Sequence, residues 1–305
     1  MSLELNLMNN DFEPKIGVIG GSGLYSIKQL NQVKELEINT PYGKPSDNLL
    51  LGKIENFEVV FLARHGRHHS YLPTEVPYKA NIWAMKSLGV KWLISASAVG
   101  SLKREIKPLD VVIPNQFIDR THNRPISFFG KGSVAHISLA DPFCQKLSEI
   151  IYQVALPLMP EGRDLHNGGT YLCMEGPAFS TKAESEFYRS LNCSIIGMTN
   201  HTEARLAREA EISYATIAMS TDYDCWHEDH DNVTVDMIVS NLKSNAELAA
   251  KIICGSIKKI GEIKPDSIAH DALKYALLTP KEFVPLETRK EINLITKKYW
   301  GDFIE

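Results

Sequence analysis

Short apolar runs alternate with longer stretches of helical periodicity along most of the chain. Seven of the runs are predicted to be buried strands: Lys15–Gly20, Glu58–Ala63, Lys91–Ser97, Asp110–Pro114, Thr170–Met174, Ser194–Met198 and Ser213–Ser220. Helical patterns lie at Tyr78–Leu88, Pro142–Val154, Thr181–Ser190, Thr202–Ala210, Val235–Ile260 and Pro280–Lys297. Strands that alternate with helices predict an α/β fold, in which helices cover both faces of a largely parallel sheet.

The chain is predicted to form one domain with a C-terminal helical tail. It contains no repeat, low-complexity tract or linker-like run, and a Lys- and Pro-containing stretch at 258–265 is its one break. We therefore expect a catalytic domain at 15–262 and a flexible N-terminal tail at 1–14. The C-terminal helical extension, 263–305, is expected to pack on the domain or on a neighbouring subunit.

Composition narrows the class of partner. The 305 residues are 44% hydrophobic and 23% charged, and the formal net charge is −4. These values are ordinary for a globular protein and give no sign of a basic nucleic-acid surface. No apolar run approaches the roughly 20 residues that span a bilayer. We therefore expect a small-molecule partner, with no nucleic acid and no membrane.

The cysteines indicate the compartment. The five cysteines are widely spaced without a CxxC pair, and residues 1–14 lack the basic and apolar regions of a signal peptide. An odd number of cysteines without a signal sequence favours reduced thiols, so a cytoplasmic location is expected.

A glycine loop follows the first predicted strand, and ligands of doubly wound sheets lie outside the carboxyl ends of strands. The loop, Gly17–Gly23, suits an anion through its amides and the Ser22 hydroxyl, although plain tight turns also use such glycines. A dinucleotide motif fails because its third glycine position is Ser26, and no Lys-Ser/Thr pair completes a P-loop.

Two further strand ends carry candidate anion ligands. Arg64 and His65 begin a basic segment in which Arg suits bidentate phosphate recognition and His adds a donor or a proton. A solvated loop is the alternative, and a zinc site lacks a carboxylate or cysteine at a matching spacing. Ser97 lies among small residues that either complete an anion pocket or make a tight turn.

Two later segments suit a nucleoside. Phe179 precedes a helix that Ser180 or Thr181 caps, and from there its ring can stack on a purine. Met198 offers an apolar floor for a sugar, and Thr199 adds a hydroxyl. A buried Phe and a core Met are the ordinary alternatives.

Two carboxylates, Asp222 and Asp224, end the last apolar strand. They would be costly to leave unpaired there, which favours ligand recognition. The nearby His227 and His230 stand at i and i+3, not at the HExxH spacing, so we expect a solvated gate and no metal.

Together these motifs resemble those of the 5′-methylthioadenosine phosphorylases, within the purine nucleoside phosphorylase superfamily. The resemblance runs from about Lys15 to Ile260 and rests on GVIGGSGLY, FLARHGR, YKANIWAMKSLG, GSLKREIKPLDVVIPNQFIDRT, HISLADPFC, MEGPAFST, GMTN and TDYDCW, in that order. It implies a single α/β domain of the nucleoside phosphorylase type, in homotrimers with sites near the subunit interface. It also implies a role in methionine and purine salvage, with inorganic phosphate as co-substrate and no cofactor.

The resemblance also assigns site residues. Phosphate binding is implied for Ser22, Arg64, His65, Ser97 and Thr199. Nucleoside binding is implied for Ala98, Phe179, Met198, Asp222, Asp224, Val235 and Ile238, and for His136 from a neighbouring subunit. The catalytic pair is Asp222 and Asp224.

Some positions depart from the family's pattern. Ala178 stands where many relatives carry Arg or Gln, so the loop of Phe179 lacks a polar anchor. Ser22 and Ser97 stand where some relatives carry Thr, which preserves the hydroxyl, and Thr202 stands where Pro is common.

The expected reaction is phosphorolysis of 5′-methylthioadenosine to adenine and 5-methylthioribose 1-phosphate. Asp222 would protonate N7 of the leaving base and Asp224 would accept from the 6-amino group, or these roles are exchanged. A carboxylate accepts from an amine, which favours adenine.

Three alternatives share parts of this site. A phosphorylase of 5′-methylthioinosine or of purine nucleosides in general differs only in its base. A non-catalytic nucleoside-binding module would use the same scaffold without turnover. A hydrolase would leave the anion ligands without a role.

Overall fold

The computed structural model describes residues 15–24, 27–227 and 235–303, and for 235–240 the backbone alone. The predicted tail at 1–14 and most of the predicted gate lie outside the described residues. The described strands are β1 (Lys15–Gly20), β2 (Asn31–Leu36), β3 (Leu49–Ile54), β4 (Phe57–Ala63), β5 (Val90–Ser101), β6 (Val111–Ile113), β7 (Gln116–Arg120), β8 (Leu165–Asn167), β9 (Thr170–Met174), β10 (Ile195–Gly197) and β11 (Ser213–Asp222). The described α-helices are α1 (Tyr78–Ser87), α2 (Gln145–Ala155), α3 (Lys182–Ser190), α4 (Asn200–Glu209), α5 (Val235–Ile263) and α6 (Leu286–Trp300).

These strands form one mixed sheet, and β5 lies at its centre, paired with β1, β10 and β11. Its strand order is β2-β3-β4-β1-β5-β10-β9-β7, and β11, β6 and β8 branch from β5. The pairs β4–β1, β1–β5 and β5–β11 are parallel, while β10 joins the end of β5 in the antiparallel sense. The expected α/β class with a largely parallel mixed sheet is confirmed.

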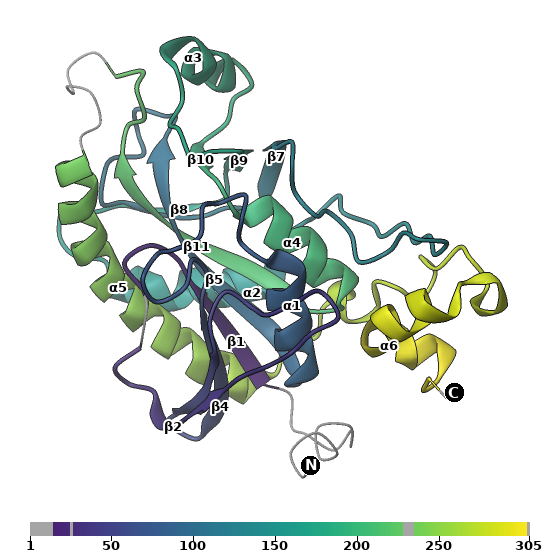
Figure 1. Ribbon diagram of the computed structural model, residues 1–305. Helices are drawn as coiled ribbons and strands as arrows, with labels where there is room; N and C mark the ends of the chain where they lie inside the picture. Colours follow the sequence, from purple (N-terminus) through teal and green to yellow (C-terminus); the bar gives the residue numbers. More distant parts are fainter. Residues whose placement is uncertain (1–14, 25–26, 228–234, 304–305) are drawn as a thin grey trace.

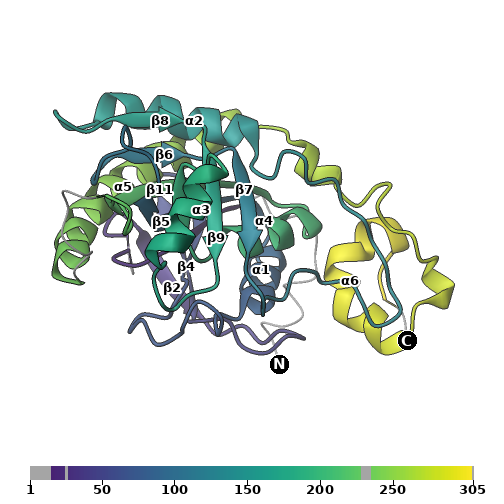
Figure 2. The ribbon, with the colours of Figure 1, turned by 90° about the horizontal axis from the view of Figure 1, so that it is seen from above.

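Helices cover both faces of the sheet (Figures 1 and 2). Side chains that alternate along β1 contribute to a separate core layer on each face. Ile16 and Val18 face α2 and α5, whereas Ile19 faces α1 and α4. All three side chains are almost fully buried. A strand that is apolar on both faces is typical of a sheet covered by helices on both sides.

Two predicted strands continue further than their apolar runs. β5 extends through Ser101 and β11 through Asp222, where the two strands still pair in parallel, Asp222 opposite Gly100. Both extensions consist largely of small or polar residues, so hydrophobic periodicity does not mark them. They carry the pairing into the region where ligands of such sheets bind.

The described part of the C-terminal extension packs on the domain, beside α1 (Figure 1). Trp92 of β5 donates its indole N–H to the carbonyl of Pro265 at 2.8 Å. The sequence predicts the last helix from Pro280, but α6 begins at Leu286. A short 3-10 helix forms at Lys281–Phe283, and the extended backbone of Val284 and Pro285 separates it from α6.

Candidate functional site

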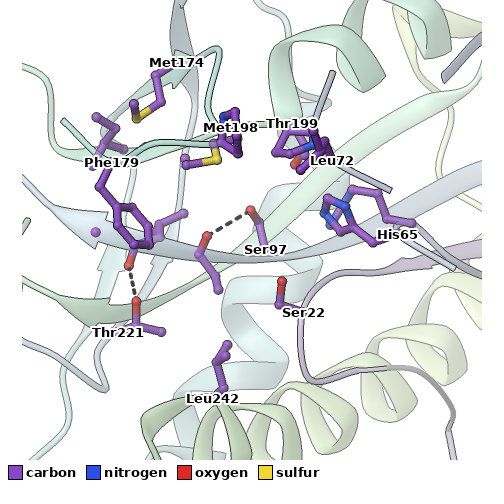
Figure 3. A pocket seen from close by; sticks show the side chains of 18 of the residues that line it. Ser22, His65, Leu72, Ser97, Met174, Phe179, Met198, Thr199, Thr221 and Leu242 are labelled. Carbon is purple, nitrogen blue, oxygen red and sulfur yellow. Dashed lines mark hydrogen bonds between the residues drawn. The ribbon is translucent and has the colours of Figure 1, made fainter. Parts of the chain in front are cut away.

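The carboxyl ends of the central strands open into a cavity of about 340 Å³. Figure 3 shows Ser22, His65 and Thr199 on one side of it and Phe179 and Thr221 on the other. Ten of the residues predicted from the sequence line it: Ser22, Arg64, His65, Ser97, Ala98, Phe179, Met198, Thr199, Asp222 and Asp224. The fold therefore brings together predicted residues from six separate segments of the chain.

Three predicted residues are not placed there. His136 does not line the cavity; its backbone N–H donates to Ala276 at 2.9 Å, in the segment that reaches the C-terminal extension. The side chains of Val235 and Ile238 lie outside the described residues. Leu242, further along the same helix, does line the cavity.

Arg64 is a fixed, buried cation at one end of the cavity. Only 1% of its surface is exposed. Its Nε and Nη2 both donate to Glu203, and Nη2 also donates to Ser95 Oγ at 2.6 Å. Burial alone would lower the Arg64 pKa, but the carboxylate of Glu203 raises it, so the guanidinium stays charged. Because these contacts hold the guanidinium in place, the direction of its remaining N–H donors is fixed.

His65 lies beside this cation as a neutral ring. Its Nδ1 is 2.9 Å from the carbonyl oxygen of Tyr71, which can only accept, so Nδ1 carries the proton and Nε2 carries the lone pair. Burial and then the charge of Arg64 lower the His65 pKa to about 4. The ring stacks on His69 with centroids 4.5 Å apart.

Hydroxyl groups and backbone ends complete this end of the cavity. Thr199 precedes α4, whose N-terminus carries positive partial charge. Ser22 lies in the turn after β1, where a Cβ on Gly21 would meet the Ala96 carbonyl at 2.5 Å. Glycine is therefore required for this loop to approach β5. The result is a set of donors around one space, suited to an oxyanion.

The opposite end holds two carboxyl groups, Asp224, which is buried, and Asp222, which is partly buried. Asp222 accepts from Thr221 Oγ1 at 2.6 Å and from the backbone N–H of Asp224 at 2.8 Å. Asp224 accepts from Ser185 Oγ at 2.6 Å. Burial raises the pKa of both groups; with the charge of Asp222 nearby, the pKa of Asp224 reaches about 6. Both carboxyl groups therefore hold a proton more readily than an exposed aspartate does.

Phe179 stands 58% exposed on the loop before α3. Thr181 caps that helix in a capping box with Glu184, which confirms the predicted cap. Ala178 offers no polar anchor, whereas Glu175, at the start of the loop, makes several polar contacts. Glu175 accepts from Arg124 Nε at 2.9 Å and from Thr74 Oγ1 at 2.7 Å.

Backbone donors also reach Glu175. The N–H groups of His122 and Asn123 donate to its second carboxylate oxygen. Burial would raise the Glu175 pKa, but these donors and Arg124 lower it to about 2. The carboxylate therefore joins the loop of Phe179 to the segments at 72–75 and 119–124.

Comparison with known proteins decides the family. The model of the phosphorylase superfamily matches residues 15–258. The chain is 60% identical to the S-methyl-5′-thioadenosine phosphorylase of Prochlorococcus marinus, over 95% of this chain and 92% of that protein. The corresponding enzyme of Thermosynechococcus vestitus is 56% identical, over 93% of this chain and 99% of its own. The chain belongs to the S-methyl-5′-thioadenosine phosphorylases.

Solved structures of this family share the fold. A methylthioadenosine phosphorylase from an Antarctic soil metagenomic library superposes with a TM-score of 0.88 at 47% identity, covering 92% of this chain and 98% of that one. The enzyme of Schistosoma mansoni in complex with adenine gives 0.79 at 35% identity, covering 82% and 93%. The resemblance seen in the sequence motifs is thereby confirmed.

Several residues of this phosphorylase site escaped the sequence analysis. Glu203 belongs to no recognisable motif. A buried Arg requires a carboxylate partner, however, so the burial of Arg64 indicates that such a residue must lie nearby. Leu72 and Pro73 line the cavity from an irregular segment without periodicity. Ser185 reaches Asp224 from a helix that the sequence places 39 residues away.

Two properties of the phosphorylase chain bear on cofactors and membranes. In residues 15–24, 27–227 and 235–303, no group of three or more His, Cys, Asp or Glu side chains is placed to hold a metal ion. Within the same ranges, no helix has both the length and the apolar character to cross a membrane.

Proposed function

We propose that this protein cleaves 5′-methylthioadenosine with inorganic phosphate, releasing adenine and 5-methylthioribose 1-phosphate. The observation that carries the proposal is a single cavity with a fixed cation and hydroxyl donors at one end and two carboxyl groups of raised pKa at the other. Membership of the family supports the same reaction. The adenine complex of the Schistosoma relative supports adenine as the base.

Phosphate is proposed to bind at the end formed by Ser22, Arg64, Ser97 and Thr199. These groups donate hydrogen bonds to its oxygens, and the paired, immobile guanidinium offsets its charge. The Nε2 lone pair of neutral His65 would accept a hydrogen bond from the hydroxyl of hydrogen phosphate. Phosphate is the co-substrate, and no metal or organic cofactor takes part.

The purine is proposed to lie between Phe179 and the carboxyl pair. Bond cleavage leaves negative charge on adenine, so a proton or strong hydrogen bond at N7 speeds departure. Asp222 would supply it, and Asp224 would accept from the 6-amino group. Cationic character on the ribose faces the bound phosphate, which then bonds to C1′.

Apolar groups would hold the rest of the nucleoside. Ala98 and Met198 border the cavity between its two ends, where the ribose would lie. Val235 and Ile238 would line the methylthio pocket together with Leu242. An apolar pocket discriminates weakly against a small added or missing group, so adenosine would be a slower substrate.

The protein is further proposed to be a cytoplasmic homotrimer that acts in methionine and purine salvage. His136 would enter the site of a neighbouring subunit, in keeping with its place away from the cavity of its own chain. Val134 and Leu278, which flank its segment, are 45% and 58% exposed and apolar. Analytical ultracentrifugation tests this: a mass of about three times 34.2 kDa supports the trimer, and a monomer contradicts it.

The deciding experiment is chromatography of the purified enzyme with 5′-methylthioadenosine, with and without phosphate. Parallel reactions contain 5′-methylthioinosine and inosine. Adenine that appears only with phosphate supports the proposal. Faster release of hypoxanthine would overturn the assignment of Asp222 and Asp224, product without phosphate would indicate a hydrolase, and no turnover would indicate a binding module.

A further inference from the structure

A second, much smaller cavity lies beneath the phosphate end of the site. It shares Ser22, Ser97 and Leu242 with the large cavity and is closed below by Asn245 and Ala249 of α5. Its volume is about 10 Å³. A single water needs roughly 10–15 Å³ on this measure, so the space is about that of one water molecule.

Asn245 brings an unsatisfied acceptor to this cavity. The residue is only 2% exposed. Its Nδ2 donates to the carbonyl of Ser220 at 2.9 Å, which fixes the orientation of the amide because a carbonyl cannot donate. In the part of the chain that the structure describes, no donor reaches its Oδ1. Buried acceptors are nearly always satisfied by protein or by ordered water.

The hydroxyl of Ser97, which borders the small cavity, is weakly constrained by protein. The contacts of Ser97 Oγ, to Tyr171 Oη at 3.3 Å and to the Ala98 carbonyl at 3.4 Å, are both long for hydroxyl hydrogen bonds. A hydroxyl that rotates freely does not present its proton to an anion in advance.

We infer that this cavity binds one ordered water that links Asn245 to the phosphate-binding serines, which makes Asn245 a positioning residue for phosphate. The water donates one proton to Asn245 Oδ1 and the other to the Oγ of Ser97 or Ser22. A hydroxyl whose lone pair is engaged in this way turns its own proton toward the phosphate. The inference rests on the proposed phosphate site.

A crystal structure of the enzyme with phosphate, at a resolution that shows ordered water, tests the binding step. We expect water density within hydrogen-bond distance of Asn245 Oδ1 and of one serine hydroxyl. A dry cavity, or a protein donor on Oδ1, would overturn the inference. Phosphate bound away from Ser22 and Ser97 would instead overturn the proposed phosphate site, which keeps the two failures distinct.

Kinetics of Asn245→Leu test the positioning step. Loss of one water-mediated hydrogen bond to an anion site should raise the KM for phosphate by about 5- to 10-fold. The KM for the nucleoside should change less than about twofold. Asn241→Leu is the matched control, because Asn241 donates from the same helix to the Thr221 carbonyl at 2.7 Å. It removes a helix-to-strand hydrogen bond without touching the small cavity.

Ala249→Val provides a second route that leaves Asn245 and both serines intact. Its added methyl groups would occupy the cavity and displace the water, with the same selective rise in the KM for phosphate. Equal changes in both KM values, or an unchanged KM for phosphate in both folded variants, would reduce the water to a structural role and overturn the positioning claim.

Discussion

At the scale of single residues, the site depends on ionisable groups whose pKa values burial shifts away from their ordinary ranges. The pKa of Asp224 is raised to about 6 by burial first and by Asp222 second. As the proposed acceptor of the 6-amino group, Asp224 would have to be ionised. We therefore expect kcat/KM for the nucleoside to fall as the pH drops through about 6, and this limb to be absent in Asp224→Asn.

The same variant should lose about 10- to 100-fold in kcat/KM at pH 7, because a hydrogen bond to a charged group contributes about 1.5–3 kcal/mol. Rate profiles between pH 5 and 8 measure both effects. A profile that instead falls as the pH rises through 6, and loses that fall in Asp224→Asn, would assign the proton donor to Asp224 and exchange the two roles.

Glu203 neutralises Arg64, and both side chains are 2% exposed. Glu203→Gln leaves the guanidinium buried without a counter-charge, and breaking such a pair costs about 3–5 kcal/mol. We expect a clearly lower Tm that phosphate restores in part, because a bound anion faces the same cation. Thermal unfolding with and without phosphate measures this, with the exposed Glu149→Gln as control. A Tm equal to that of the control would contradict the pairing argument.

At the scale of elements, Glu175 joins the separate segments that form the walls of the cavity. One of its oxygens accepts from Arg124 and Thr74 and the other from two backbone N–H groups, so four donors face one carboxylate. A glutamine amide cannot accept on both sides. Glu175→Gln should therefore loosen the loop of Phe179 and raise the KM for the nucleoside by about 5- to 10-fold, the effect of one lost hydrogen bond.

The KM for phosphate should stay within about twofold in Glu175→Gln, because the phosphate end contains none of these contacts. Glu184→Gln is the control, since glutamine also completes a capping box. Steady-state kinetics that vary each substrate separate the cases. An equal rise in both KM values would mean general loss of structure rather than a displaced loop.

The elements also show how far the sequence alone was informative. Buried strands such as β1 follow from their apolar runs, since all six residues of Lys15–Gly20 are buried. β2, with the sequence NQVKEL, is almost wholly exposed at the sheet edge and carries no apolar period. This segment forms a strand because it pairs with β3, and its own residues give no signal of that pairing. Motif residues at strand ends were predictable, whereas supporting groups such as Glu203 depend on tertiary contact.

At the scale of the whole molecule, Glu211 connects the C-terminal extension to the domain. It lies in the turn between α4 and β11, is 5% exposed, and accepts from Leu273 N at 3.1 Å and from Tyr299 Oη. Lys298 approaches the same carboxylate at 3.4 Å. One buried side chain thus holds three points of the extension, which in turn pairs with the segment of His136 through Ala276.

Glu211→Ala should therefore free the extension without disturbing the cavity directly. The buried Leu273 N–H and the partly buried Tyr299 hydroxyl lose their acceptor, at about 1–3 kcal/mol for a buried group left unsatisfied. Lys298, which is exposed, keeps Asp271 and the carbonyl of His270 as acceptors. We expect faster proteolytic cleavage within 263–305 and, if His136 serves a neighbouring site, a loss of activity that follows dissociation of the proposed trimer. Limited proteolysis and sedimentation at several concentrations measure the two effects. An extension as resistant as that of the wild type would show that its apolar packing on α1 is sufficient, and that Glu211 has no such linking role.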